Sequence, residues 1–315
     1  TKLLIYTNSK RVWRLNTKGD YYILDINSGS LIQLGKGLEP SEMMFAKFSP
    51  DGTKVAYVYK NNLYFEHFHG NHTHRTQLTF DGSDIIINGN FDWVYEEELH
   101  QHDGFRWSPD SQKIAYWQFD TEGTGTFYMV NNIDSVYASL IPLPYPKAGT
   151  TNSAARIGVV NAGHNPETKW FDIPGDPHNN YIARIDFVPG SDEIMIQQLN
   201  RLQNTNNLYY GNAGTMELDN FFTETDEAFL DIHDYIHWGK ENEFFTWTSE
   251  RDGWRHLYKV SADGNTIEPI TAGEFDVVEV VNVDIKSGYV YYIASPGNPL
   301  ERYLYRTKMN GKCKA

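Results

Sequence analysis

Short aromatic strands separated by tight turns recur along the chain. Phe-Ser-Pro-Asp-Gly at 48–52 precedes an alternating run at 54–58, and Trp-Ser-Pro-Asp-Ser at 107–111 precedes a similar run at 113–117. Related units occupy 187–196 and 238–247. Each unit combines an aromatic strand end, a turn rich in Pro, Asp and Gly, and a second strand. This pattern predicts a series of β-hairpins.

A second hairpin follows several of these units, for example at 63–82 and 257–273. Two hairpins per repeat make a four-stranded antiparallel sheet, and the repeat centres lie about 47 to 80 residues apart. The sequence therefore predicts an all-β fold, a β-propeller of four-stranded antiparallel blades. A two-sheet sandwich is the alternative, but it would need fewer repeated turns and seldom reaches 315 residues.

One propeller domain is expected over residues 1–315, and its first and last blades look incomplete. A closed propeller normally mixes strands from both termini, because an open ring leaves unpaired sheet edges. We therefore expect an incomplete propeller that belongs to a larger protein. The six blade candidates are 1–37, 44–83, 85–165, 168–223, 229–272 and 276–315.

The composition narrows the function classes. The net charge of −14 argues against nucleic acid and anionic lipid as partners, because both require a basic surface. The chain contains no run of 18 apolar residues, so no membrane span is expected. Its single cysteine, Cys313, allows no internal disulfide. Hydrophobic residues make up 40% of the chain, which is compatible with a large packed core.

The run Asp-Trp-Val-Tyr-Glu-Glu-Glu at 92–98 predicts an aromatic strand that leads into three carboxylates. Only 96–102 and 223–229 have a pattern compatible with a helical turn. Adjacent acids on a rigid scaffold suit a cation such as a free peptide amine, which is largely protonated at neutral pH and has three donors. A solvated acidic turn is the alternative.

Other chemistry is weak or absent. No Gly-x-Ser-x-Gly turn occurs, and no alternation of strands with long helices predicts a hydrolase domain. The chain alone should therefore be inactive as a peptidase. His67, His69, His72 and His74 lack the ordered spacing of zinc motifs, so we expect neither a metal nor a cofactor.

The run at 92–98 resembles the propeller domain of the dipeptidyl peptidase IV family, in the prolyl oligopeptidase clan. The resemblance extends over nearly the whole chain. The scarcity of cysteine and the lean loops favour a bacterial member, in the periplasm or on the cell surface. Further matching stretches are 107–109, 114–116, 144–149, 199–204 and 249–258.

The resemblance implies an eight-bladed propeller that caps an α/β-hydrolase domain with a Ser-Asp-His triad, which is absent from this chain. Such exopeptidases release dipeptides, and in some members tripeptides, from free N-termini with Pro or Ala next to the cut. The second and third glutamates of the run, Glu97 and Glu98 here, would hold the peptide amino terminus. Glu96, Tyr95 and Trp93 would support them. Relatives often dimerise partly through a propeller extension; the matching region near 161–180 looks short, which leaves a homodimer open.

Two features of the family are not matched. Its arginine that holds a substrate carbonyl would fall near Leu38, with Lys36 close by, and a substrate-facing Phe-Arg pair is missing around 231–233. Substrate preference beyond binding of the amine therefore stays open. A catalytically silent relative that acts as a binding or regulatory module is a second hypothesis, because some members of the family keep the propeller glutamates after losing the nucleophile. A stand-alone binding propeller of the sensor or glycan type is a third.

Overall fold

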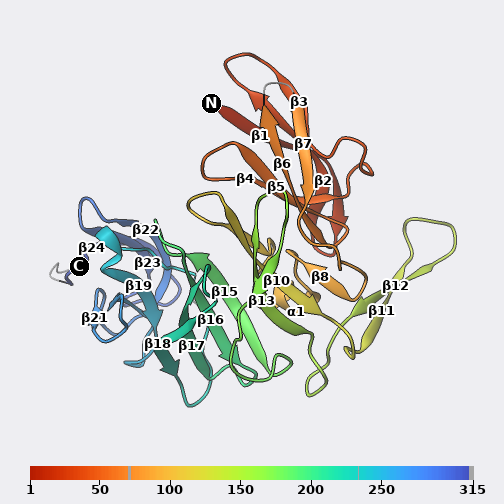
Figure 1. The fold of residues 1–315 in the computed structure, drawn as a ribbon. Helices are drawn as coiled ribbons and strands as arrows, with labels where there is room; N and C mark the ends of the chain where they lie inside the picture. Colours follow the sequence, from red (N-terminus) through yellow and green to blue (C-terminus); the bar gives the residue numbers. More distant parts are fainter. Residues whose placement is uncertain (70–71, 233, 312–315) are drawn as a thin grey trace. The chain divides into compact units, whose positions relative to one another are not determined.

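The computed structural model describes residues 1–69, 72–232 and 234–311, and its ordered elements there are nearly all antiparallel strands (Figure 1). The chain divides into two compact units. The first contains Thr1–Arg201 and Gly211–Leu218, and the second contains Leu202–Tyr210 and Asp219–Ala315. Within the described ranges, no helix has the length and apolar character needed to cross a membrane.

The first unit begins with a long hairpin whose second strand also pairs with a later strand of the same sheet. Pairing of Lys18 with Met44 and of Gly19 with Met43 joins β2 to β4. Alternating residues such as Ile23, Val55 and Tyr57 point into a buried core. The strands are β1 (Lys2–Val12), β2 (Leu15–Asp25), β3 (Leu31–Gln33), β4 (Met43–Phe48), β5 (Lys54–Tyr59), β6 (Asn62–His69) and β7 (His72–Gln77).

A second sheet of this unit is centred on β10, whose residues Trp117 and Phe119 are fully buried. Separate from it, β11 and β12 form a two-stranded hairpin, and β15 pairs with β16. The strands are β8 (Ile86–Asn88), β9 (Phe105–Trp107), β10 (Lys113–Asp120), β11 (Thr126–Asn131), β12 (Ser139–Pro144), β13 (Ala154–Asn161), β14 (Thr168–Trp170), β15 (Asn180–Phe187) and β16 (Glu193–Asn200).

Local hydrogen bonds explain why the repeated Ser-Pro-Asp motif forms hairpin turns. The Ser49 hydroxyl donates to Asp51 at 2.6 Å and accepts the N–H of Lys54 at 3.0 Å. Ser108 makes the equivalent bonds in the second motif. Each serine therefore closes the turn from within, and β4–β5 and β9–β10 pair on either side as the sequence predicts.

The remaining strands lie mostly in the second unit. Strands β19, β20 and β21 form one antiparallel sheet, and β22, β23 and β24 form another around a core that includes Leu257, Val290 and Tyr292. The elements are β17 (Thr205–Asn212), β18 (Leu218–Thr225), the 3₁₀ turn η1 (Lys240–Asn242), β19 (Phe244–Ser249), β20 (His256–Ser261), β21 (Ile267–Pro269), β22 (Val277–Asp284), β23 (Tyr289–Ala294) and β24 (Tyr303–Lys308).

The acidic run does not form the predicted strand; it forms a short helix, α1 (Trp93–Glu97). Asp92 caps the helix by accepting the N–H of Tyr95 at 3.0 Å, and its other oxygen accepts from Ser153 at 2.7 Å. A capping Asp followed by Glu in the first turn favours a helix. The helical turn predicted at 96–102 is limited to its first two residues, and the one predicted at 223–229 is wrong because β18 runs to Thr225.

Candidate functional site

Helix α1 places three consecutive acids in three different environments. Glu96 is buried, Glu97 is half-buried and Glu98 is exposed. Successive residues of an α-helix point about 100° apart, because 3.6 residues make one turn. The carboxylate of Glu96 therefore faces the interior, that of Glu97 is partly exposed, and that of Glu98 reaches solvent.

Glu97 is bound to a cation supplied by a distant part of the first unit. The Nε of Arg14 lies 2.5 Å from both carboxylate oxygens of Glu97. Arg14 sits in the turn between β1 and β2, 83 residues earlier in the chain. Its side chain is 73% exposed, whereas that of Glu97 is 13% exposed. The guanidinium group of Arg14 therefore lies at the solvent-exposed edge of the site.

Glu96 faces a mostly apolar hollow of about 160 Å³ that is partly open to solvent. The indole rings of Trp13 and Trp93 line it together with Phe91 and Leu143. The Oε1 atom of Glu96 is buried without a hydrogen-bond partner. Burial, reinforced by the negative charge of Glu97, raises the pKa of Glu96 to about 7.

Two aromatic residues fix the helix. Tyr95 is buried against Phe119, with ring centroids 4.6 Å apart, and its hydroxyl accepts the backbone N–H of Ile182 at 2.9 Å. Trp93 packs on Tyr145 at 4.3 Å. The five residues singled out from the sequence therefore lie on or directly after α1, and their role in binding a peptide stays a prediction.

Sequence reasoning missed Arg14. A salt bridge over 83 residues leaves no local signal, because strand pairing alone decides which turn reaches α1. Leu38 packs against the core of the first sheet, and Lys36 is exposed.

The histidines give no metal centre in the described part of the chain, where no group of three or more His, Cys, Asp or Glu side chains could hold a metal ion. His67 and His74 are cross-strand neighbours on β6 and β7. His233 and Cys313 lie outside the described residues.

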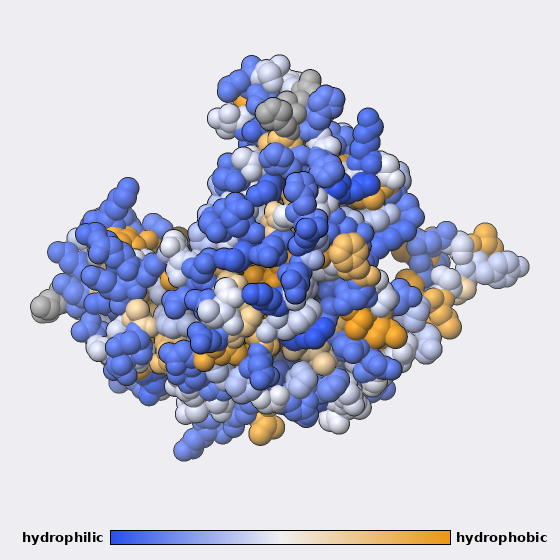
Figure 2. Space-filling model, viewed as in Figure 1, coloured by the Kyte–Doolittle hydropathy of each residue, from blue (hydrophilic) through white to orange (hydrophobic). Residues whose placement is uncertain are grey.

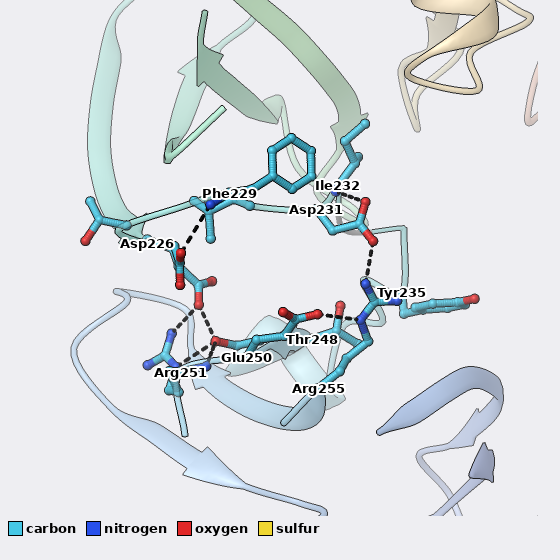
Figure 3. A pocket seen from close by; sticks show the side chains of 13 residues that line it. Asp226, Phe229, Asp231, Ile232, Tyr235, Thr248, Glu250, Arg251 and Arg255 are labelled. Carbon is cyan, nitrogen blue, oxygen red and sulfur yellow. Dashed lines mark hydrogen bonds and ion pairs between the residues drawn. The ribbon is translucent and has the colours of Figure 1, made fainter. Parts of the chain in front are cut away.

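A second pocket lies within the second unit, where charged side chains surround a hollow (Figure 3). Arg255 bonds Asp231 and Glu250, and Arg251 lies 3.3 Å from buried Glu224. Glu224 also accepts from the Trp247 indole N–H and the Ser249 hydroxyl. Phe229, whose side chain is 54% exposed, also lines this pocket. These charges satisfy one another, so we interpret the cluster as structural.

Comparison with known proteins decides the family. The model of the dipeptidyl peptidase IV (DPP IV) N-terminal region matches residues 1–315. The chain belongs to this family. Dipeptidyl peptidase 4 of Arthroderma otae is 28% identical over 325 residues, and that of Trichophyton rubrum is 28% identical over 319 residues. The alignments cover 99% and 97% of this chain but only 41% and 40% of those relatives.

A solved DPP IV family structure supports the same conclusion. The crystal structure of Porphyromonas gingivalis dipeptidyl peptidase 4 superposes with a TM-score of 0.88 at 29% identity, covering 98% of this chain and 43% of that one. The predictions of an incomplete all-β propeller and of membership in the DPP IV family are confirmed. The individual blade boundaries stay a prediction.

Replacing Glu96 by Gln should stabilise the protein only at higher pH. Because the folded-state pKa of Glu96 lies above the unfolded value, the stability cost of ionisation is absent below about pH 4.5 and complete above about pH 7. We expect Glu96→Gln to raise the free energy of unfolding by about 1–3 kcal/mol at pH 8 and to change it little at pH 4.5. Urea unfolding at both pH values measures this, with exposed Glu98→Gln as control. An equal effect at both pH values would contradict the assignment.

The Glu224 cluster gives a second stability prediction. Glu224→Ala leaves the Trp247 N–H, the Ser249 hydroxyl and Arg251 without their shared acceptor, so the free energy of unfolding should fall by about 2–4 kcal/mol. Glu250→Ala in the same pocket removes an exposed ion pair and should cost less than about 1 kcal/mol. Equal losses in the two variants, measured by denaturant melts, would refute a buried structural role for Glu224.

Proposed function

We propose that this chain is the substrate-anchoring and gating propeller of a dipeptidyl-peptidase-IV-like serine exopeptidase. The enzyme would release N-terminal dipeptides, or tripeptides, with Pro or Ala next to the cut. Membership of the family supports the peptidase class, and the acids of α1 support the anchoring role. Glu97 and Glu98 would bind the ammonium group of the peptide.

The observation that carries this proposal is the Arg14–Glu97 ion pair. A half-buried carboxylate that already binds a guanidinium is suited to binding an ammonium group. Each charge-assisted hydrogen bond to such a group contributes about 1.5–3 kcal/mol. An exposed acid next to it, Glu98, supplies a second acceptor. A primary ammonium has three donors and can bond both carboxylates.

Anchoring the amine would determine the cleavage position. If the ammonium is fixed on α1, the distance from α1 to a nucleophile decides how many residues are removed. That contribution is positional and needs no bond chemistry from the propeller. The chain spans about 41% of the relatives it matches, and we propose that the rest of the protein contains the α/β-hydrolase domain with its Ser-Asp-His triad. We also propose a bacterial, extracytoplasmic enzyme.

A catalytically silent relative that acts as a binding or regulatory module is the second candidate. A relative that had lost the nucleophile could keep the same α1. Hydrolysis of an Ala-Pro chromogenic substrate by the full-length protein separates the two candidates.

We further propose that a homodimer would use the β11–β12 hairpin. In Figure 2 apolar side chains gather on the arm that Figure 1 labels β11 and β12. Tyr128, Val130 and Leu140 are each more than half exposed, and Asp134 is the one charged residue from 126 to 144. Monomers rarely expose such a patch without a partner. The region near 161–180, which corresponds by resemblance to the family's extension and looks short in sequence, includes strand β14 of the second sheet.

The dimer proposal predicts that the hairpin controls association. Replacing Tyr128 and Leu140 together by Ser should raise the dissociation constant of the dimer at least about tenfold, because each buried side chain of this size contributes about 1.5–3 kcal/mol to association. Sedimentation equilibrium measures the change. The matched control replaces exposed Leu202 by Ser. An unchanged dimer, or a wild-type monomer, would refute this interface.

Removing the negative charge of Glu97 or of Glu98 should impair catalysis. Glu97→Gln or Glu98→Gln in the full-length protein should lower kcat/KM for an Ala-Pro substrate by about two orders of magnitude, because a charge-assisted bond to the ammonium is lost. Exposed Glu122→Gln serves as the control. Near-wild-type kinetics in both variants would remove the assignment, as would equal turnover of the N-acetylated substrate.

A further inference from the structure

The hollow beside helix α1 contains a carboxylate that its surroundings do not satisfy. Glu96 is 7% exposed, and its Oε1 atom has no hydrogen-bond partner within the described ranges. Burial of a carboxylate without a partner is unfavourable. The helix sets the direction of side chain 96 but not its charge, and an apolar side chain would fill the same place at lower cost. The glutamate therefore points to a ligand that it binds.

Apolar and aromatic side chains form most of the hollow. The rings of Trp13, Phe91 and Trp93 and the side chain of Leu143 line it. A cavity of about 150 Å³ accommodates a molecule of the size of benzene, so a volume of about 160 Å³ has room for a stem of about four carbons. Indole rings also attract cations, because the face of the ring carries negative charge.

The residues that line the hollow do not neutralise its negative charge. Those that the structure describes there include two acids, Asp92 and Glu96, and no basic side chain. Both oxygens of Asp92 already accept hydrogen bonds, one in the helix cap and one from Ser153. Arg14, in the adjoining turn, binds Glu97 instead. Glu96 is therefore the acceptor that is left for a cation.

The two amide side chains at the hollow are directed to other groups. The Nδ2 atom of Asn61 donates to the carbonyl of Ser83 at 2.8 Å, and that of Asn90 contacts the sulfur of Met44 at 3.8 Å. A buried water needs about two to four polar partners, and this hollow offers mainly carbon. A cation on an apolar stem, in contrast, suits both the carboxylate of Glu96 and the apolar wall.

The first unit binds one of its own ammonium groups in a comparable environment. The Nζ atom of Lys47 lies 2.7 Å from a carboxylate oxygen of Asp103 and 4.0 Å from the centroid of the Phe105 ring. A carboxylate and an aromatic face thus contact the same ammonium group. The hollow of Glu96 combines these two kinds of group, and none of its described lining residues is a lysine.

We propose that this hollow binds a primary ammonium group on an unbranched apolar stem, with Glu96 as the acceptor and the rings of Trp13 and Trp93 beside the stem. A lysine side chain of a peptide and a free alkylamine share this chemistry. The inference goes beyond the proposed function, in which Glu97 and Glu98 bind the peptide amino terminus and Glu96 only supports them.

Binding at this site should depend on pH. Burial and the charge of Glu97 raise the pKa of Glu96 to about 7. The other charged groups beside it are Asp92, whose pKa burial also raises, and Arg14, which is bound to Glu97. An alkylammonium, with a pKa near that of lysine at about 10.4, stays charged at both pH 6 and pH 8. Because the ionised form of Glu96 binds the cation, the dissociation constant should be about tenfold higher at pH 6 than at pH 8.

Calorimetry of the full-length protein with n-butylammonium chloride tests the site. Glu96→Gln, which removes the charge and keeps the size, should weaken binding at least about tenfold at pH 8. Leu143→Phe, which narrows the hollow and leaves the charge in place, should weaken it too. Exposed Glu122→Gln is the matched control and should bind like wild type. 1-Butanol, which has the same stem without the charge, should bind more weakly than butylammonium by at least about tenfold.

A second probe distinguishes the two sources of the ammonium group. In Nα-acetyl-lysine methylamide the α-amine is blocked, so only the side chain can supply a cation. Binding of this probe that is lost in Glu96→Gln assigns the site to peptide lysines. Binding of butylammonium alone, again lost in Glu96→Gln, assigns it to free alkylamines.

Other results would overturn the proposal. Equal binding by Glu96→Gln and wild type refutes it, and so does a dissociation constant that is the same at pH 6 and pH 8. If Glu97→Gln loses butylammonium while Glu96→Gln keeps it, the cation occupies the peptide-amine site, and only this inference fails. If Glu96→Gln loses butylammonium but N-acetylated and free peptides are turned over equally, the proposed function fails and the Glu96 site stands.

Discussion

The burial of one tyrosine fixes the geometry of the acid site. Tyr95 is 2% exposed and is enclosed by the rings of Phe91 and Phe119. A buried phenol must also satisfy its hydroxyl, and the N–H of Ile182 does so. Since few orientations meet both demands, helix α1 can adopt only one rotation about its axis. The directions of the next three side chains follow from that rotation.

The same constraint explains why one acid is left in an unfavourable place. When Tyr95 points inward, Glu96 must face the hollow, where its Oε1 finds no partner and its pKa rises. Glu97 and Glu98 then reach the rim. The unfavourable burial of Glu96 is therefore tied to the accessibility of its two neighbours, and a helix of this length cannot separate them.

What the sequence predicts well is local. The Ser-Pro-Asp turns close through hydrogen bonds within a few residues, so the hairpins at Ser49 and Ser108 can be predicted from the local sequence alone. The run at 92–98 identifies the family for a similar reason, because it is contiguous. The strand assigned to that run was wrong, since alternating Trp93 and Tyr95 suit a strand as well as a helix until the cap at Asp92 is considered. Arg14 was unpredictable because only the path of β1 and β2 brings it to α1.

The register shift in β15 limits which changes of chain length this strand can tolerate during evolution. Register shifts between Ile182 and Arg184, and both backbone groups of Ile182 bind side chains: its N–H binds Tyr95, and its carbonyl accepts from the Trp117 indole. The ladder irregularity thus serves as a docking point for a segment 87 residues away. Insertions or deletions in β15 should be selected against even where the sheet could absorb them, because they would shift the helix that carries the acids.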